Sequence, residues 1–480
     1  MMDQWSGKRV LILGAARQGL ALARWLAQHG AAVTLSDMRA EEQLDDARAM
    51  LAGVQVRWFC GGHPLELLDD ADVLCLSGGV PMKLAIVQEA LRRGIPLSND
   101  TQIFMEVVPC KTVGITGSAG KTTTTALVGE MAQRAMNERQ NLGGAGKTSA
   151  VSPSAFVGGN IGDPLLNHVD EMKASDLAIL EISSFQLEQM TRSPNVAAIL
   201  NITPNHLDRH ATMQAYTAAK ARILEFQVPA DTAVLGRDDP GAWRMRSRVK
   251  GRLSSFGTSK IEGLGDGAYF DDGVLYLSDR GVDIPLLRRS QVQLRGPHNV
   301  LNVLAAFAIG QAAGLPLDAM LTGAEKFRGM PHRLELVREL RGVSWFDDSI
   351  ATAPERTIAA IRAFNEPIVL LLGGRDKELP WGDLADLVHQ RVDHVVLFGE
   401  AADKIETALA ATAPKGAEKS GARPYTTERA AHLHEAILKA DREAETGDVV
   451  LLSPGGTSFD EFKDFEERGE YFREWVQALT

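Results

Sequence analysis

Residues 113–125 constrain the fold more than any other stretch of this chain. They read VGITGSAGKTTTT: an apolar run, a turn containing glycine, then Gly-Lys-Thr and the start of a helical pattern. A strand that enters such a turn and leaves as a helix binds phosphate, because glycine lets backbone N–H groups face an anion and the helix adds its positive end. Lys121 supplies a point charge, and the Thr122 hydroxyl suits Mg²⁺. The segment predicts an α/β domain with a phosphate-binding loop.

The loop is shorter than the usual phosphate-binding motif. The spacing G-x-x-x-x-G-K would need glycine at Ile115, so only the part from Gly117 to Lys121 is present. A turn that serves packing alone is the alternative, which Gly-Lys-Thr after a strand disfavours. Another Gly-Lys-Thr segment, Gly144–Thr148, has no strand before it and no apolar periodicity after it. We predict that it belongs to a flexible loop over Asn141–Ser154.

Composition limits the classes of partner. A chain of 480 residues with 45% hydrophobic content is too long for one core and predicts about three domains. The net charge of −11 argues against nucleic acid and anionic membranes and favours small molecules. The three cysteines show no C-x-x-C spacing, so neither a disulfide framework nor a thiolate zinc site is indicated. Without a signal-peptide core or a membrane-spanning apolar run, a cytoplasmic protein is expected.

The order of strand and helix patterns predicts an α/β fold of three domains, over residues 1–109, 110–329 and 330–480. The first reads as a small parallel, Rossmann-like sheet with strands at 9–13, 32–36 and 72–76 and a helix at 17–29. It lacks a full G-x-G-x-x-G, which favours a nucleotide-like ligand smaller than a dinucleotide. Asp37 closes its second strand and is interpreted either as a sugar ligand or as a turn residue.

The middle domain places candidate ligands at the ends of two further strands. Glu181 ends the strand Leu177–Ile182, where a carboxylate suits Mg²⁺, with an ordinary surface glutamate as the alternative. His206 and Asp208 follow the strand Val196–Ile202 and reach the same rim, although a lone histidine is more often a structural donor than a ligand.

Lys220 lies in the expected helix Gln214–Phe226, on one face with Tyr216 and Leu224. Its neighbours predict only a solvated lysine. A β-rich stretch over 268–293 and helices over 299–313 and 318–327 complete the middle domain.

Strand and helix patterns alternate again in the last domain, with strands at 367–372, 394–398 and 448–452. Glycine turns follow two of these strands, at Gly373–Lys377 and Gly455–Ser458. Each turn alone reads as a simple loop. Together, at two strand ends of one sheet, they predict a site for a small anionic substrate.

An ordered set of motifs resembles the Mur ligases over essentially the whole chain. It comprises Gly117–Thr124, Gly159–Gly162, Glu181–Glu188, His206–Arg209, Ala218–Lys220, Gly296–Asn302, Pro331–Arg333, Asp347–Ser349 and Leu451–Pro454. The resemblance is strongest to members that join glutamate to UDP-N-acetylmuramoyl-L-alanine. It implies a Rossmann-like UDP-binding domain, a central P-loop-type ATPase domain and a Rossmann-like glutamate-binding domain.

The resemblance also implies the reaction and the cofactors. The chain is expected to use ATP and two Mg²⁺ ions to add D-glutamate through an acyl phosphate, in peptidoglycan precursor synthesis, cell shape and cell division. A monomer is expected, with neither nucleic-acid binding nor membrane insertion.

Site residues follow position by position from the resemblance. The catalytic positions fall on Lys121, Asn160, Glu181, His206, Lys220 and His332, and the metal ligands on Thr122, Glu181, His206 and a carbamylated Lys220. The ATP contacts fall on Gly117, Ser118, Ala119, Gly120, Lys121, Thr122, Thr123, Asn299, Asn302, Arg333 and Asp376. The UDP-substrate contacts fall on Gly14, Ala15, Ala16, Asp37, Arg39, Ser77 and Gly78, and the glutamate contacts on Thr352, Lys377, Ser458 and Phe465.

Two positions depart from the family pattern. Ile350 stands where the glutamate ligases usually have lysine, which removes a cation near the amino-acid site and keeps L-glutamate as a possible substrate. Arg375 stands where the family has an acidic ribose contact, with Asp376 one residue later. Two further functions stay open: a folylpolyglutamate ligase, which residues 1–109 disfavour, and a non-catalytic nucleotide-binding protein.

Overall fold

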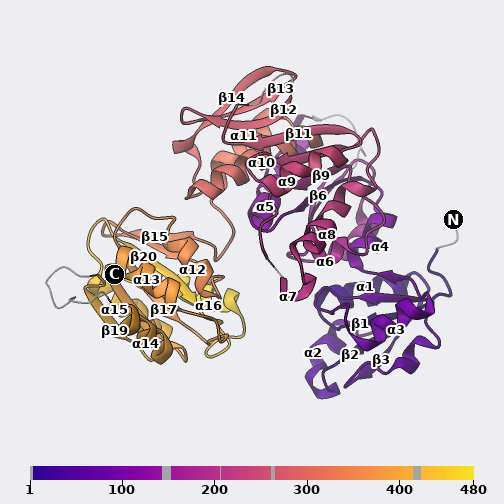
Figure 1. Ribbon diagram of the computed structural model, residues 1–480, viewed down its shortest axis with the longest axis horizontal. Helices are drawn as coiled ribbons and strands as arrows, with labels where there is room; N and C mark the ends of the chain where they lie inside the picture. The colour runs from indigo at the N-terminus through magenta and orange to yellow at the C-terminus, as the bar shows by residue number, and fades with distance from the viewer. Residues whose placement is uncertain (1–3, 143–152, 206, 261–264, 414–422) are drawn as a thin grey trace. The chain divides into compact units, whose positions relative to one another are not determined.

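The computed structural model describes residues 4–142, 153–205, 207–260, 265–413 and 423–480 (Figure 1). These residues form three β-sheets that follow one another along the chain, each with helices between its strands. The expected three-domain α/β architecture is therefore confirmed. They divide into two compact units, residues 1–291 with 300–326 and residues 292–299 with 327–480. The first unit holds two sheets and the second unit holds one. The exact boundaries at 109 and 329 stay a prediction.

The first sheet is parallel throughout and has the strand order β3-β2-β1-β4-β5. Its strands are β1 (Arg9–Leu13), β2 (Ala32–Asp37), β3 (Val56–Cys60), β4 (Val73–Leu76) and β5 (Leu97–Ser98), and its helices are α1 (Arg17–Gln28), α2 (Asp45–Met50), α3 (Ala85–Arg93) and α4 (Asp100–Val107). The strand order reverses between β1 and β4. Ligands of open α/β sheets bind at such a switch point, beyond the carboxyl ends of the strands.

The middle sheet has the order β14-β13-β12-β11-β10-β9-β6-β8-β7. Its strands are β6 (Lys111–Thr116), β7 (Ala155–Gly159), β8 (Leu177–Glu181), β9 (Val196–Ile199), β10 (Thr232–Gly236), β11 (Arg252–Gly257), β12 (Asp266–Asp271), β13 (Val274–Asp279) and β14 (Val282–Arg288). The pairs from β7 to β12 are parallel, and β12, β13 and β14 form an antiparallel extension. Because β6 lies between β8 and β9, the ends of those two strands flank the phosphate loop.

The helices of this middle region complete the element list. They are α5 (Lys121–Leu142), α6 (Ser184–Leu187), α7 (Leu207–His210), α8 (Met213–Glu225), α9 (Pro240–Arg244), α10 (Pro297–Ala313) and α11 (Leu317–Lys326). The helix α5 continues to Leu142, inside the stretch expected to be a loop. The other Gly-Lys-Thr segment, Gly144–Thr148, lies outside the described residues.

The last sheet has the order β15-β16-β20-β17-β18-β19, with only β15 antiparallel to its neighbour. Its strands are β15 (Glu335–Leu340), β16 (Val343–Asp347), β17 (Ile368–Gly373), β18 (His394–Phe398), β19 (Thr426–Arg429) and β20 (Val449–Gly455), and its helices are α12 (Pro354–Ile361), α13 (Gly382–Arg391), α14 (Ala402–Thr412), α15 (Leu433–Glu443) and α16 (Phe465–Ala478).

Helices cover both faces of this sheet. Leu370 and Leu372 of β17 join one buried cluster, and Val369 and Leu371 join the other. Alternate side chains thus enter opposite cores, which explains why the strand is an unbroken apolar run. No helix among the residues that the structure describes is long and apolar enough to cross a membrane.

Candidate active site

The phosphate loop is held by the segment that follows β9. The N–H of Ser118 donates to the carbonyl of Asn201 at 3.0 Å, and the N–H of Ala119 donates to the Asn201 side chain at 2.8 Å. Gly120 has φ of +82°, and a Cβ there would lie 2.3 Å from Oδ1 of Asn302. The backbone conformation and the close approach both require glycine, so the loop is pre-shaped before any ligand arrives.

Two lysines converge on this loop. Nζ of Lys121 and Nζ of Lys220 each donate to the carbonyl of Gly117 at 2.9 Å, and Lys220 also donates to Oγ1 of Thr116 at 3.3 Å. Burial and the nearby charge of Lys121 lower the pKa of Lys220 to about 7, although Glu181 acts in the opposite direction. The two side chains place their amino groups together at the carboxyl end of β6.

The prediction that Lys220 is solvated is wrong. Only 1% of the residue is exposed, and its ammonium lies 4.7 Å from the centre of the Tyr216 ring. The helix periodicity placed Tyr216, Lys220 and Leu224 correctly on one face of α8, and all three are buried. Nothing in the local sequence revealed that this face packs against the phosphate loop.

Glu181 offers a buried oxygen to the same edge of the sheet. Its Oε1 accepts a hydrogen bond from Nδ2 of Asn160 at 2.9 Å, while its buried Oε2 has no hydrogen-bond partner among the described residues. Leaving a carboxylate oxygen buried and unsatisfied is costly, and a bound cation removes that cost. Glu181 and the half-buried Thr122 therefore fit a magnesium site. His206, the other predicted ligand beside Lys220, lies outside the described residues.

The predicted UDP-substrate residues gather at the carboxyl ends of β1, β2 and β4. Oδ2 of Asp37 accepts the N–H of Ala15 at 2.7 Å, and Oδ1 accepts the N–H of Arg39 at 2.9 Å. Burial alone would raise the pKa of Asp37, but hydrogen bonds from Arg39 and Ala15 outweigh it and lower the pKa to about 2. Asp37 thus fixes the turn after β1 as an anion. The remaining members of the set, Gly14, Ala16, Ser77 and Gly78, lie in the turns after β1 and β4.

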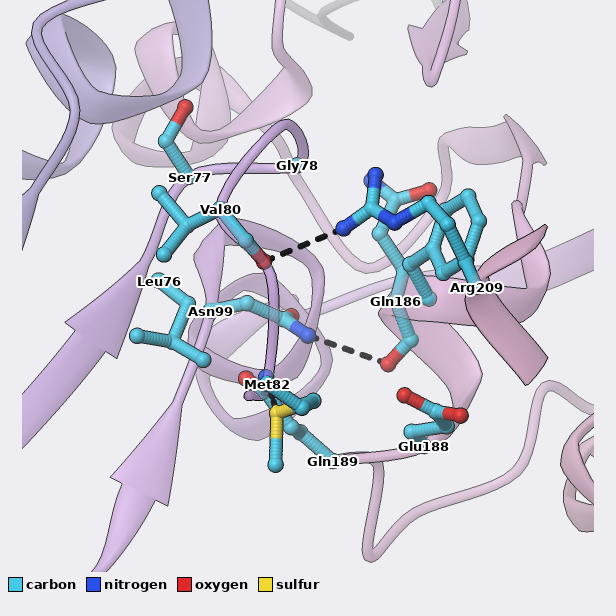
Figure 2. A pocket seen from close by; sticks show the side chains of 11 residues that line it. Leu76, Ser77, Gly78, Val80, Met82, Asn99, Gln186, Glu188, Gln189 and Arg209 are labelled. Carbon is cyan, nitrogen blue, oxygen red and sulfur yellow. Dashed lines mark hydrogen bonds between the residues drawn. The ribbon is translucent and has the colours of Figure 1, made fainter. Parts of the chain in front are cut away.

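A pocket joins this turn region to the middle domain (Figure 2). Ser77, Gly78 and Gln186 line it, and Nη2 of Arg209 donates to the carbonyl of Val80 at 3.2 Å across it. The Arg209 guanidinium also lies 4.0 Å from the centre of the Phe185 ring. The motif containing Arg209 was recognised in the sequence, but this bridging role was missed because its acceptor lies 129 residues away.

In the second unit, two of the predicted glutamate-site residues meet directly. Nζ of Lys377 donates to Oγ1 of Thr352 at 3.3 Å. Ser458 is almost fully buried, and the carbonyl of Phe465 accepts the hydroxyl of Ser349 at 2.8 Å. The structure brings these four predicted residues to the carboxyl end of one sheet.

Arg468 is a residue of this region that the sequence did not reveal. It is completely buried and donates to Oγ and the carbonyl of Ser349, at 3.0 and 2.8 Å, and to the carbonyl of Gly456 at 3.2 Å. A buried guanidinium is retained only where its donors are satisfied. Arg468 therefore fixes the loop after β16 against the turn after β20.

His332 lies on the same edge of this sheet. It is buried, and its Nδ1 lies 2.7 Å from Oδ2 of Asp347. Burial alone would lower the pKa of His332, but the hydrogen bond and the charge of Asp347 outweigh it and raise the pKa. Beside it, burial raises the pKa of Asp348 to about 7, and Oδ2 of Asp348 accepts the hydroxyl of Ser453 at 2.8 Å.

The predicted ATP contacts outside the phosphate loop are distributed over both units. Asn299 and Asn302 lie one turn apart on α10, and Arg333 follows His332. Asp376 is already bound within the chain, because its carboxylate accepts Nε1 of Trp381 at 3.1 Å and Nζ of Lys404 at 2.5 Å. Arg375 instead pairs with Glu400.

The class of protein is defined by the middle of three successive sheets: a multidomain α/β protein with a phosphate-binding loop on which two lysines converge. Residues 8–99 match the MurD-like N-terminal domain of Mur ligases, residues 115–310 the Mur ligase middle domain, and residues 332–456 the glutamate ligase domain. The chain belongs to the Mur ligase family.

Relatives and solved structures agree with this assignment. The chain is 38% identical over 473 residues to the UDP-N-acetylmuramoylalanine--D-glutamate ligase of Symbiobacterium thermophilum, covering 98% of each chain. It is 39% identical over 475 residues to the protein of the same name from Geobacter metallireducens, covering 99% of this chain and 98% of the relative.

Among solved structures, the UDP-N-acetylmuramate-alanine ligase MurC of Thermotoga maritima is similar with a TM-score of 0.56 at 20% identity, covering 98% of this chain and 99% of that one. MurF of Acinetobacter baumannii has a TM-score of 0.56 at 18% identity, covering 98% and 94%. At these identities the structures show the shared fold.

Proposed function

We propose that this protein uses ATP to join D-glutamate to UDP-N-acetylmuramoyl-L-alanine, in the synthesis of peptidoglycan precursors. The observation that carries the proposal is the convergence of Lys121 and Lys220 on the Gly117 carbonyl, next to the unpartnered oxygen of Glu181. Relatives that match over their full length at 37–39% identity are named for this reaction, and their names support the proposed choice of substrates. The match of residues 8–99 to a MurD-like domain disfavours a folylpolyglutamate ligase.

The proposed reaction has two steps. An oxygen of the alanyl carboxylate attacks the γ-phosphorus of ATP, and the bond to the β–γ bridging oxygen breaks with its electron pair leaving on ADP. The glutamate amine then attacks the acyl phosphate, loses a proton, and the tetrahedral intermediate expels inorganic phosphate to leave the amide. Phosphoryl transfer depends mainly on positioning and charge stabilisation. Lys121 and the N–H groups at the start of α5 provide these for the triphosphate.

Magnesium fits the proposed site on the evidence of Glu181. We propose Thr122 and Glu181 as ligands of one ion and His206 and Lys220 as ligands of a second. Mg²⁺, when bound, neutralises charge on the transferring phosphoryl group. As an ammonium Lys220 would repel such an ion, so we propose that it is carbamylated. Its pKa of about 7 supports this, because the neutral amine is the form that reacts with CO₂.

The remaining site residues are proposed to position the three substrates. Asn160 orients Glu181, and His332 orients the intermediate. The turns at Gly14–Ala16, Asp37–Arg39 and Ser77–Gly78 hold the UDP-substrate, while Asn299, Asn302, Arg333 and Asp376 contact ATP. Thr352, Lys377, Ser458 and Phe465 bind glutamate, with Arg468 as a positioning residue behind them. We propose a monomer in the cytoplasm, and the free thiols of Cys60, Cys75 and Cys110 support a reducing compartment.

The same ligation with L-glutamate is the second candidate, and Ile350 is the observation that favours it. We expect D-glutamate to be preferred by about 10²-fold or more in kcat/KM, because misplacing one carboxylate leaves buried polar groups unpaired. Product formation is measured with each enantiomer in the presence of UDP-N-acetylmuramoyl-L-alanine and ATP. The Ile350→Lys variant serves as a matched comparison for the missing cation. A preference of the unaltered chain for L-glutamate would reverse the assignment.

A further inference from the structure

A groove separate from the proposed active site lies at the same edge of the middle sheet as the phosphate loop. It lies beyond β9 and β10, the next two strands after β6 in the sheet. Ile202 follows β9, and Pro240 and Gly241 open α9 just after β10. Since β9 is the direct neighbour of β6, the groove is also beyond the carboxyl ends of parallel strands. Its lining includes Ile202, Met213, Met245, Arg244 and Arg248, and its volume is about 550 Å³. That volume is within the range of small-molecule sites.

The groove has an apolar floor. Ile202 and Met245 are buried, and Met213 is half-buried beside them. Methionine side chains adapt to ligands of different shape because they are flexible and polarisable. The floor therefore suits the apolar body of an organic molecule.

The rim of the groove carries two exposed guanidinium groups. Arg244 and Arg248 both line it, and no ion pair or hydrogen bond joins either guanidinium to another part of the described chain. They belong to a short run of alternating cations, Arg244, Arg246 and Arg248, and no acidic side chain lines the groove, in a chain of net charge −11. The groove is thus a local positive site on an acidic protein.

The helix α8 separates the groove from the proposed active site. Its buried face carries Tyr216 and Lys220 toward the phosphate loop, where Lys220 reaches the Gly117 carbonyl. Gln214, Thr217 and Ala218 of the same helix line the groove instead. The two sites share one helix and no lining residue.

We propose that this groove binds an organic phosphate with an apolar body. The apolar floor takes the body, and Arg244 and Arg248 take the phosphate. Two unpaired guanidiniums match the charge of a phosphate monoester dianion better than that of a single carboxylate, and the planar fork of arginine fits phosphate oxygens. The inference does not depend on the proposed ligase activity, because none of the groove residues is assigned to that reaction.

The test is calorimetric binding of 1-naphthyl phosphate to the full chain and to its Lys121→Ala variant, in which anion binding at the phosphate loop is weakened and the groove is unchanged. We expect saturable binding that is at least about tenfold weaker in Arg244→Gln/Arg248→Gln, since the double variant removes both charged donors to the phosphate. Arg246→Gln is the matched control. Arg246 belongs to the same run but lies over the Trp243 ring at 5.2 Å and does not line the groove. Its substitution is expected to change affinity less than about twofold, in line with screened surface charges.

Two smaller probes test the apolar floor and the arginine pair separately. 1-Naphthol and inorganic phosphate are each expected to bind far more weakly than 1-naphthyl phosphate. The proposal is overturned if 1-naphthyl phosphate does not bind, if 1-naphthol binds equally well, or if Arg246→Gln loses as much affinity as the double variant. A different outcome is that the chain binds heparin but not 1-naphthyl phosphate, and that each single arginine substitution lowers the affinity for heparin equally. That outcome would identify a surface for polyanions instead.

Discussion

The Lys121→Ala variant is expected to lose ligase turnover by about 10³-fold or more, because it removes the cation that the phosphate loop is proposed to direct at the transferring phosphoryl group. The Lys121 ammonium lies 2.9 Å from the Gly117 carbonyl, at the start of α5. Phosphate release is measured with all three substrates present.

Lys147→Ala is the matched control for this variant. Lys147 occupies the corresponding place in the other Gly-Lys-Thr segment, which lacks a preceding strand pattern in the sequence. We expect the control to retain full turnover. Near-normal phosphate release by Lys121→Ala would refute the role of the loop in catalysis.

The Lys220→Ala variant is expected to lose about 10²–10³-fold in turnover, comparable to the loss of one preorganised charged group, and to recover partly when acetate or propionate is added. A short carboxylate is expected to fill the space left by the side chain and to restore the negative charge of the proposed carbamate. Lys173→Ala, an exposed lysine on the same domain, should keep its activity and show no response to acetate.

The pH dependence of Lys220 gives a second readout. Its pKa is lowered from 10.5 to about 7, so the neutral amine is plentiful above pH 7 and disappears as the pH falls below 7. We therefore expect CO₂-depleted enzyme to lose activity, and bicarbonate to restore it more effectively above pH 7 than below it. Full activity of Lys220→Ala without carboxylates would make this lysine a structural residue.

The fold was largely predictable because its strands are apolar runs bounded by turn residues. The strands β1 and β18 have the predicted bounds, and β17 is shifted by one residue at each end. The edge strand β3 was not predicted, because its half-exposed residues give no continuous apolar run. In β20 the strand continues into Ser453–Gly455, where pairing with β17 outweighs the turn propensity of proline and glycine.

The site was predictable where the chemistry is local. The phosphate loop and Glu181 are each read from a strand and the residues that follow it. The burial of Lys220 and the bridge made by Arg468 depend on contacts between residues more than 100 positions apart, which no local periodicity records. Asp37 was interpreted as a ligand or a turn residue, and its hydrogen bonds to Ala15 and Arg39 give it a structural role at the predicted place.

The central claim, that a carboxylate is activated by phosphoryl transfer before the amide forms, is tested most directly with ¹⁸O. UDP-N-acetylmuramoyl-L-alanine labelled in both carboxylate oxygens is supplied with ATP and D-glutamate, and the released phosphate is analysed by mass. An acyl phosphate predicts that each molecule of phosphate carries a single ¹⁸O from the acid. Amide and ADP formed with unlabelled phosphate would contradict the account.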